Sequence, residues 1–330
     1  MASDRLLLLL LRVTFLLTSL SRAALCATFT LTNSCGYTVW PGLLSSAGSP
    51  PLATTGFALA PGESRAVDAP AAWSGRVWGR TLCGADQASG RFACATGDCG
   101  SGAVECGGGG AAPPTTLAEF TLNGGGGNDF YDVSLVDGSN LPMVVVPQGG
   151  VGGATCGATG CLVDLNAPCP ADLKVAGADG AGIACKSACE AFGTPEYCCS
   201  GAFGRPATCQ PSAYSQFFKN ACPRAYSYAY DDATSTFTCA SGTVDYLVVF
   251  CPSISSLKSS VGGGANPSTS GAGLPLINDT VSFLNHGGGG GGGYYDASCS
   301  SSPAAPSCTV LLLLLLAHAA TAVLAACGHR

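Results

Sequence analysis

Residues 90–106 read Gly-Arg-Phe-Ala-Cys-Ala-Thr-Gly-Asp-Cys-Gly-Ser-Gly-Ala-Val-Glu-Cys and are the most informative stretch of the sequence. Cys99 and Cys106 can close a tight loop here, because the glycines permit backbone angles that other residues rarely adopt. The whole chain has 330 residues and 20 cysteines. Such a density is rare where thiols stay reduced, so the sequence predicts a disulfide-bonded protein of an oxidising compartment.

The composition excludes several classes of function. Only 10% of the residues are charged and 47% are hydrophobic, which argues against disorder of the main body. The formal net charge of −6 argues against nucleic acid as a partner. The three histidines, His286, His318 and His329, all follow the last cysteine of the main body. Histidine-dependent nucleophilic catalysis and histidine-ligated zinc are therefore excluded upstream, and we expect neither a metal nor a cofactor.

Short alternating segments predict a mainly β domain. Residues 27–32 alternate Phe29 and Leu31 with threonines, which is the period of a half-buried strand. Further strand-like segments, separated by Gly/Pro turns, lie at 38–40, 76–78, 117–122 and 132–136. Many short strands with such turns are typical of a sandwich or barrel.

The region 156–222 differs from the strands before it. Its strand pattern fades and its cysteines crowd together. We expect a loop-rich lobe held by disulfides rather than a second independent core, with short helices at 184–192 and 212–220.

The stretch 90–106 resembles, position for position, the signature of the plant thaumatin-like proteins, which include pathogenesis-related members. The resemblance extends over the body of the chain through Trp78-Gly79-Arg80-Thr81, Leu117-Ala118-Glu119-Phe120, Val136-Asp137-Gly138, Tyr197-Cys198-Cys199, Cys222-Pro223, Ala225-Tyr226-Ser227-Tyr228 and Thr236-Phe237-Thr238-Cys239. It implies a β-sandwich or flattened barrel with a disulfide-rich lobe.

The resemblance also implies eight disulfides, and sixteen cysteines lie from Cys35 to Cys251. The adjacent Cys198 and Cys199 cannot easily bond each other, so they should have different partners. Carried over from the family, the pairs are Cys35–Cys251, Cys83–Cys94, Cys99–Cys106, Cys156–Cys239, Cys161–Cys222, Cys169–Cys185, Cys189–Cys198 and Cys199–Cys209.

An acidic cleft is a further implication of the resemblance. Its five family positions fall on Arg76, Glu119, Asp132, Asp137 and Asp231, with the neighbouring Asp232 as another candidate for the last. Clustered carboxylates accept hydrogen bonds from sugar hydroxyls, the arginine would limit their repulsion, and Phe130 and Tyr131 are candidates for a stacking face. Strand alternation alone does not place Asp132 and Asp137 on one side of a sheet.

Three functions fit these residues. The first is a cell-surface defence protein that binds β-1,3-glucan, with or without antifungal action. The second is an endo-β-1,3-glucanase in which Glu119 donates the proton and Asp137 is its partner, since glycoside hydrolysis needs two carboxyl groups with different pKa values. The third is a non-catalytic protein-interaction or developmental module. We expect a monomer in each case.

The two ends predict targeting signals around a domain at 27–251. Residues 1–26 have the basic start, apolar run and small residues of a secretory signal peptide. A Gly/Ser-rich linker follows at 252–297 and contains the glycosylation sequon of Asn278. Residues 298–330 combine small residues with a terminal apolar tail, the layout of a glycosylphosphatidylinositol (GPI) attachment signal, and a single membrane span is the alternative. Both place the protein at the outer face of the plasma membrane.

Overall fold

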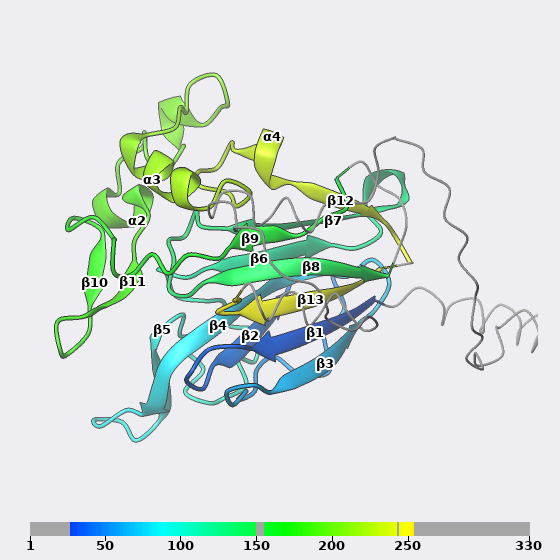
Figure 1. The fold of residues 1–330 in the computed structure, drawn as a ribbon, viewed down its shortest axis with the longest axis horizontal. Coiled ribbons are helices and arrows are strands. Elements are labelled where there is room, and N and C mark those ends of the chain that lie inside the picture. Colours follow the sequence, from blue (N-terminus) through cyan, green and yellow to red (C-terminus); the bar gives the residue numbers. More distant parts are fainter. Residues whose placement is uncertain (1–26, 150–154, 243, 254–330) are drawn as a thin grey trace, which may run out of the picture. The chain divides into compact units, whose positions relative to one another are not determined.

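A computed structural model describes residues 27–149, 155–242 and 244–253 of the chain (Figure 1). The predicted signal peptide, Asn278, the GPI signal and all of the predicted linker beyond residue 253 lie outside these residues. Within the described ranges, no helix has both the length and the apolar character needed to cross a membrane.

The first sheet brings the two ends of the domain together. Its strands run in the order β3 (Ser64–Ala69), β1 (Ala27–Asn33), β13 (Val244–Phe250), β8 (Met143–Gly149) and β9 (Thr159–Cys161). Strands β1 and β13 are parallel, and every other pair in this sheet is antiparallel. Because β1 alternates buried and half-buried residues along its length, one face of this sheet is turned to the core.

The second sheet carries most of the predicted cleft residues. Its order is β12 (Phe237–Ala240), β7 (Asn128–Ser134), β6 (Leu117–Thr121), β4 (Ser74–Ala85) and β2 (Trp40–Ser45), and β5 (Phe92–Thr96) pairs with β4. All its pairs are antiparallel. A 3-10 turn, η1 (Gly125–Gly127), connects β6 to β7.

Aromatic side chains join the two sheets face to face. The ring of Phe29 on β1 lies 4.6 Å from that of Phe120 on β6. The ring of Tyr246 on β13 lies 5.1 Å from that of Tyr131 on β7. All four side chains are almost completely buried, so the core lies between the inner faces of the two sheets, as in other β-sandwiches. The mainly β prediction is confirmed.

The stretch 90–106 folds against β4. After β5, the carboxylate of Asp98 accepts hydrogen bonds from the backbone N–H groups of Cys94 and Gly100, each at 2.7 Å. The fully buried Arg80 of β4 donates from Nη2 to the carbonyl oxygen of Val104 at 2.5 Å. The buried guanidinium thus orders the loop that follows β5 through hydrogen bonds to its backbone.

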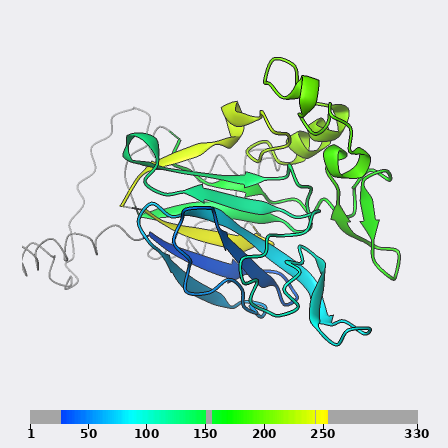
Figure 2. The same cartoon turned by 180° about the vertical axis from the view of Figure 1, so that it is seen from behind.

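A loop-rich lobe lies beyond one end of the sheets (Figures 1 and 2). It contains the hairpin of β10 (Lys174–Ala176) and β11 (Gly182–Cys185), the helices α2 (Ala188–Phe192) and α3 (Ala213–Ala221), and the 3-10 turn η2 (Gly201–Phe203). The four-residue helix α4 (Asp232–Ser235) leads from the lobe back to β12.

The predicted helix at 184–192 is wrong in its first half. Residues 184 and 185 belong to β11, and the helix begins only at Ala188. The Ser187 hydroxyl caps it by accepting a hydrogen bond from the Glu190 N–H at 3.2 Å. The helix predicted at 212–220 agrees with α3 to within one residue, because Ser212 is its capping residue.

Eight disulfides hold the domain, and they are the same eight pairs that the family resemblance implies. Cys35–Cys251 joins the ends of the domain. Cys198 and Cys199 bond to different partners, Cys189 and Cys209. A native disulfide typically contributes about 2–5 kcal/mol to the stability of a secreted domain, so the bridges are a large part of what holds the domain together.

Candidate functional site

Three predicted cleft residues form one row across adjacent strands. Arg76 on β4 lies directly opposite Glu119 on β6, and Glu119 lies opposite Asp132 on β7. Their strand neighbours Ala118 and Val133 are fully buried in the core. Since successive side chains of a strand alternate between its two faces, the row lies on the outer face of the sheet. The Arg76 Nη2 atom is 3.6 Å from the Glu119 Oε1 atom.

The turn after β7 brings Asp137 to the same region. Gly138, which follows it, has φ +83°, and a Cβ there would lie 2.6 Å from the carbonyl oxygen of Cys185. The Gly138 N–H donates to the carbonyl oxygen of Leu135 at 3.0 Å, which closes the turn. Strand alternation ends at this turn, so it does not govern the position of Asp137. This is the physical reason why the sequence pattern alone could not place Asp132 and Asp137 together.

These residues line one open cavity of about 380 Å³. Four of the five predicted cleft residues are among them, and so is the alternative Asp232. The full lining is Arg76, Leu117, Glu119, Asp132, Ser134, Val136, Asp137, Tyr226, Ala229 and Asp232. We call this space the acidic cavity.

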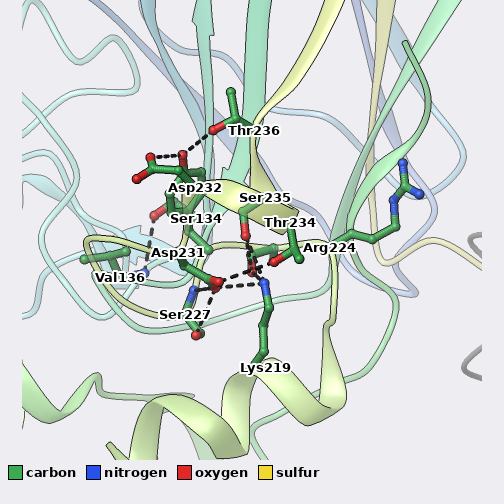
Figure 3. Close-up of polar contacts among 12 residues, drawn as sticks. Ser134, Val136, Lys219, Arg224, Ser227, Asp231, Asp232, Thr234, Ser235 and Thr236 are labelled. Carbon is green, nitrogen blue, oxygen red and sulfur yellow. Dashed lines mark hydrogen bonds and ion pairs between the residues drawn. The ribbon is translucent and has the colours of Figure 1, made fainter. Parts of the chain in front are cut away.

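Asp231 does not line the acidic cavity, and its neighbour Asp232 does. The Asp231 carboxylate is 2.8 Å from Lys219 Nζ on α3 and accepts hydrogen bonds from the N–H and hydroxyl of Ser227 at 3.0 and 3.1 Å. The Asp232 carboxylate instead accepts a hydrogen bond from the Tyr226 hydroxyl at 2.7 Å. Figure 3 shows the Asp231 carboxylate turned toward Lys219 and Ser227, with the Asp232 side chain lying apart from both.

Tyr226 is a cavity residue to which the sequence assigned no role. Its N–H donates to the carbonyl oxygen of Val133 at 2.9 Å, and its carbonyl oxygen accepts from the N–H of Leu135 at 2.8 Å. These bonds attach the segment around Tyr226 to the end of β7, where Ser134 and Tyr226 form a parallel bridge. The ring therefore belongs to the cavity wall, and its hydroxyl also bonds the hydroxyl of Thr236.

The expectation that Tyr131 offers a stacking face is wrong. Its side chain is only 1% exposed, and its hydroxyl donates to the carbonyl oxygen of Gly157 at 2.8 Å inside the core. It alternates with Asp132, so the two side chains must lie on opposite faces of β7. Phe130 is not among the lining residues of the acidic cavity either.

Burial makes the acidic cavity a proton-holding site. Burial, together with repulsion from the nearby Glu119 and Asp232 carboxylates, raises the pKa of Asp132 to about 8. The Asp132 Oδ1 atom is buried and has no hydrogen-bond partner. Burial also raises the pKa of Glu119, partly offset by the positive charge of Arg76. At neutral pH the cavity thus combines a protonated carboxyl group, which can donate a hydrogen bond, with carboxylates that can only accept.

The described part of the chain contains no group of three or more His, Cys, Asp or Glu side chains arranged to hold a metal ion. The chemistry that the acidic cavity supports with its own residues is hydrogen bonding and proton transfer. Both suit a neutral polyhydroxylated ligand, because its hydroxyls can donate to carboxylates and accept from a carboxyl group.

Comparison with known proteins gives a family match over most of the chain. The model of the thaumatin family matches residues 33–252. Thaumatin-like protein 1 of Arabidopsis thaliana is 58% identical over 233 residues, which cover 69% of this chain and 87% of that protein. Pathogenesis-related thaumatin-like protein 3.5 of Cryptomeria japonica is 57% identical over 225 residues, covering 68% and 90%. A glucan endo-1,3-beta-glucosidase of Prunus avium is 54% identical over 226 residues, covering 68% and 91%.

Proposed function

The chain belongs to the thaumatin family, and from this premise we propose that it is a defence protein that binds β-1,3-glucan in the acidic cavity. The observation that carries the proposal is the row of Arg76, Glu119 and Asp132 on three adjacent strands, which lines one cavity together with Asp137 and Asp232. The similar proteins named as pathogenesis-related and as a glucan endo-1,3-beta-glucosidase support this role and this ligand class.

The chemistry of the cavity suits an uncharged glucan. Each glucose unit presents several hydroxyl groups, and the Glu119, Asp137 and Asp232 carboxylates offer acceptors to them. The protonated Asp132 adds a donor, and its partnerless Oδ1 gains a partner when a ligand hydroxyl reaches it. The positive charge of Arg76 offsets part of the repulsion that Asp137 exerts on Glu119.

Glucan binding is tested with the full chain produced through a secretory pathway. Laminarin, a soluble β-1,3-glucan, is titrated into the wild type, Glu119→Gln and Asp132→Ala. The control is Glu196→Gln, which changes an exposed acid outside the acidic cavity. We expect each cavity variant to lose about tenfold or more in affinity, equivalent to about 1.4 kcal/mol, and the control to keep it. Equal affinity in all four proteins would refute the proposal.

Hydrolysis of the glucan is a second candidate function. The raised pKa of Glu119 supports its role as proton donor to the glycosidic oxygen, with Asp137 as the partner carboxylate. Asp132, whose pKa is about 8, is a further proton donor in the same cavity, a role that was not predicted from the sequence. Release of reducing sugar from laminarin, lost about 100-fold or more in Glu119→Gln or Asp132→Asn, would establish an enzyme. Glucan binding without such release would leave a lectin.

A non-catalytic protein-interaction or developmental module is the function left if laminarin does not bind. No contact in the described residues favours a particular protein partner, so the glucan titration decides between this function and the first two. The monomer predicted from sequence is tested in the same preparation by light scattering.

The proposed site of action is the outer face of the plasma membrane. Its support is the sequence: the secretory signal at 1–26, the glycosylation sequon at Asn278 and the GPI signal at 298–330. Phosphatidylinositol-specific phospholipase C should release the protein from plasma membranes. Resistance to the enzyme, together with release by detergent, would favour the single-span alternative.

A further inference from the structure

A second cavity adjoins the acidic one. Its volume is about 320 Å³, and it shares Val136, Asp137 and Ala229 with the acidic cavity. Each cavity alone reaches the lower end of the range of small-ligand sites, about 300–1,000 Å³. Because Asp137 lines both, a chain-like ligand in the acidic cavity that passes Asp137 enters the second cavity next.

Glu190 lines the second cavity and does not line the acidic cavity. It lies in the first turn of α2, with its N–H bonded to the capping Ser187. Its Oε2 atom is buried and has no hydrogen-bond partner. Burial and the Asp137 charge raise its pKa to about 7, against the lowering effect of Lys186. A buried oxygen without a partner is costly in a folded protein, and a ligand hydroxyl would satisfy it.

An aromatic side chain lines the second cavity together with Glu190. Tyr197 lines the second cavity, and its ring lies 5.5 Å from that of Phe192 and 5.9 Å from that of Tyr214. Phe192 is 40% exposed, which is high for a large apolar side chain. An aromatic surface beside a few convergent polar groups is typical of small-molecule sites, and it also suits the C–H face of a sugar ring.

A disulfide joins the two backbone segments that carry Glu190 and Tyr197. Glu190 follows Cys189, Tyr197 precedes Cys198, and these two cysteines are bonded. The two segments that contribute these lining residues are therefore covalently joined before any ligand arrives. Such preorganisation reduces the entropy that binding would otherwise cost.

We propose that the second cavity is a sugar subsite, in which Glu190 accepts hydrogen bonds from hydroxyls of a glucose unit and Tyr197 packs against its apolar face. This inference rests on the proposed glucan binding and adds a consequence to it. A short oligosaccharide is bound by the acidic cavity alone, whereas a longer one also contacts Glu190 and Tyr197. The second subsite thus makes the affinity depend on the length of the glucan chain.

The test is calorimetric titration of the full chain with β-1,3-linked oligosaccharides from the disaccharide to the hexasaccharide. For the wild type we expect affinity to rise with chain length. For Glu190→Ala and Tyr197→Leu we expect the hexasaccharide to bind about tenfold more weakly than it binds the wild type, and the disaccharide to bind as well as before. Glu190→Gln, which keeps one acceptor oxygen, should fall in between. Glu196→Ala is the matched control, because this exposed acid lies in the same lobe and lines neither cavity.

The outcomes separate the two proposals. If no oligosaccharide binds the wild type, both the glucan function and the subsite are refuted. If all bind and the Glu190 and Tyr197 variants follow the wild type at every length, only the subsite is refuted. If these variants weaken the disaccharide as much as the hexasaccharide, their effect is not that of a separate subsite, and the inference also fails. Thermal unfolding of Glu190→Ala at a temperature no lower than that of the wild type shows that a loss in affinity comes from the missing contact.

Discussion

Replacing Asp132 with asparagine is expected to stabilise the domain at neutral pH. In the folded protein burial raises the pKa of Asp132 to about 8, from an ordinary value of 3.8. A raised folded-state pKa means that the contribution of the protonated carboxyl group is fully present below pH 3.8 and is lost as the pH rises toward 8. An asparagine at this position does not titrate, so the unfolding free energy of the variant does not decrease with pH in this way.

The magnitude follows from the linkage between proton binding and folding. Between the two pKa values the free energy of unfolding of the wild type falls, relative to the variant, by about 1.4 kcal/mol for each pH unit. By pH 7 the accumulated difference is at most about 4 kcal/mol. The slope against pH is therefore the diagnostic quantity.

The assay is guanidinium unfolding at several pH values between 4 and 8, with the disulfides intact. The difference in unfolding free energy between Asp132→Asn and the wild type should grow steadily with pH. The exposed-acid variant Glu196→Gln is the control measured in the same series. A constant difference for Asp132→Asn across the same range would refute the reasoning, because it would mean that Asp132 ionises in the folded protein as it does in water.

Three further predictions concern the supports of the acidic cavity. Lys219→Met should cost about 2 kcal/mol of unfolding free energy, because it leaves a half-buried carboxylate without its cation; guanidinium unfolding measures this, and an unchanged midpoint would contradict it. Arg76→Leu should raise the pKa of Glu119 further. The pH profile of laminarin affinity should therefore shift to higher pH, and an unshifted profile would contradict this expectation. Gly138→Ala should destabilise by about 2 kcal/mol more than Gly62→Ala. Both glycines have positive φ, but only at Gly138 does an added Cβ meet backbone, and equal melting temperatures would argue against this contact.

Alternation within strands predicted part of the site correctly. It places Glu119 on the face opposite Ala118 and Phe120, as the structure has it. The same rule applied to residues 131 and 132 excludes Tyr131 from the cavity, since the two cannot face the same side. Alternation does not predict the register between strands. The alignment of Arg76, Glu119 and Asp132 comes from the pairing of β4, β6 and β7, which aligns residues that are far apart in sequence. The family motif supplied that information.

The choice between Asp231 and Asp232 could not be made from the sequence. The two acids are adjacent, and α4 has only four residues, so no periodic pattern assigns their directions. The deciding contact is the ion pair between Asp231 and Lys219 on α3. Asp231 does not line the acidic cavity, and Asp232 does. The start of α2 at Ala188, in contrast, could have been predicted from the sequence. Ser187 is followed three residues later by Glu190, and this is the spacing of a helix-capping box.

The floor and the wall of the acidic cavity are held by different forces. On the floor, Arg76, Glu119 and Asp132 are placed by a continuous backbone ladder across three strands. On the wall, Asp232 and Tyr226 depend on side-chain bonds and on two backbone bonds at the end of β7. A charge-neutralising change on the floor therefore alters the electrostatics of the cavity while the backbone stays in place. Removing a support of the wall, such as Lys219, shifts cavity residues that it does not itself touch. Lys219→Met is therefore expected to lose glucan affinity, as the floor variants Glu119→Gln and Asp132→Ala are, although Lys219 does not line the acidic cavity. Full affinity in Lys219→Met would show that the wall does not depend on this support.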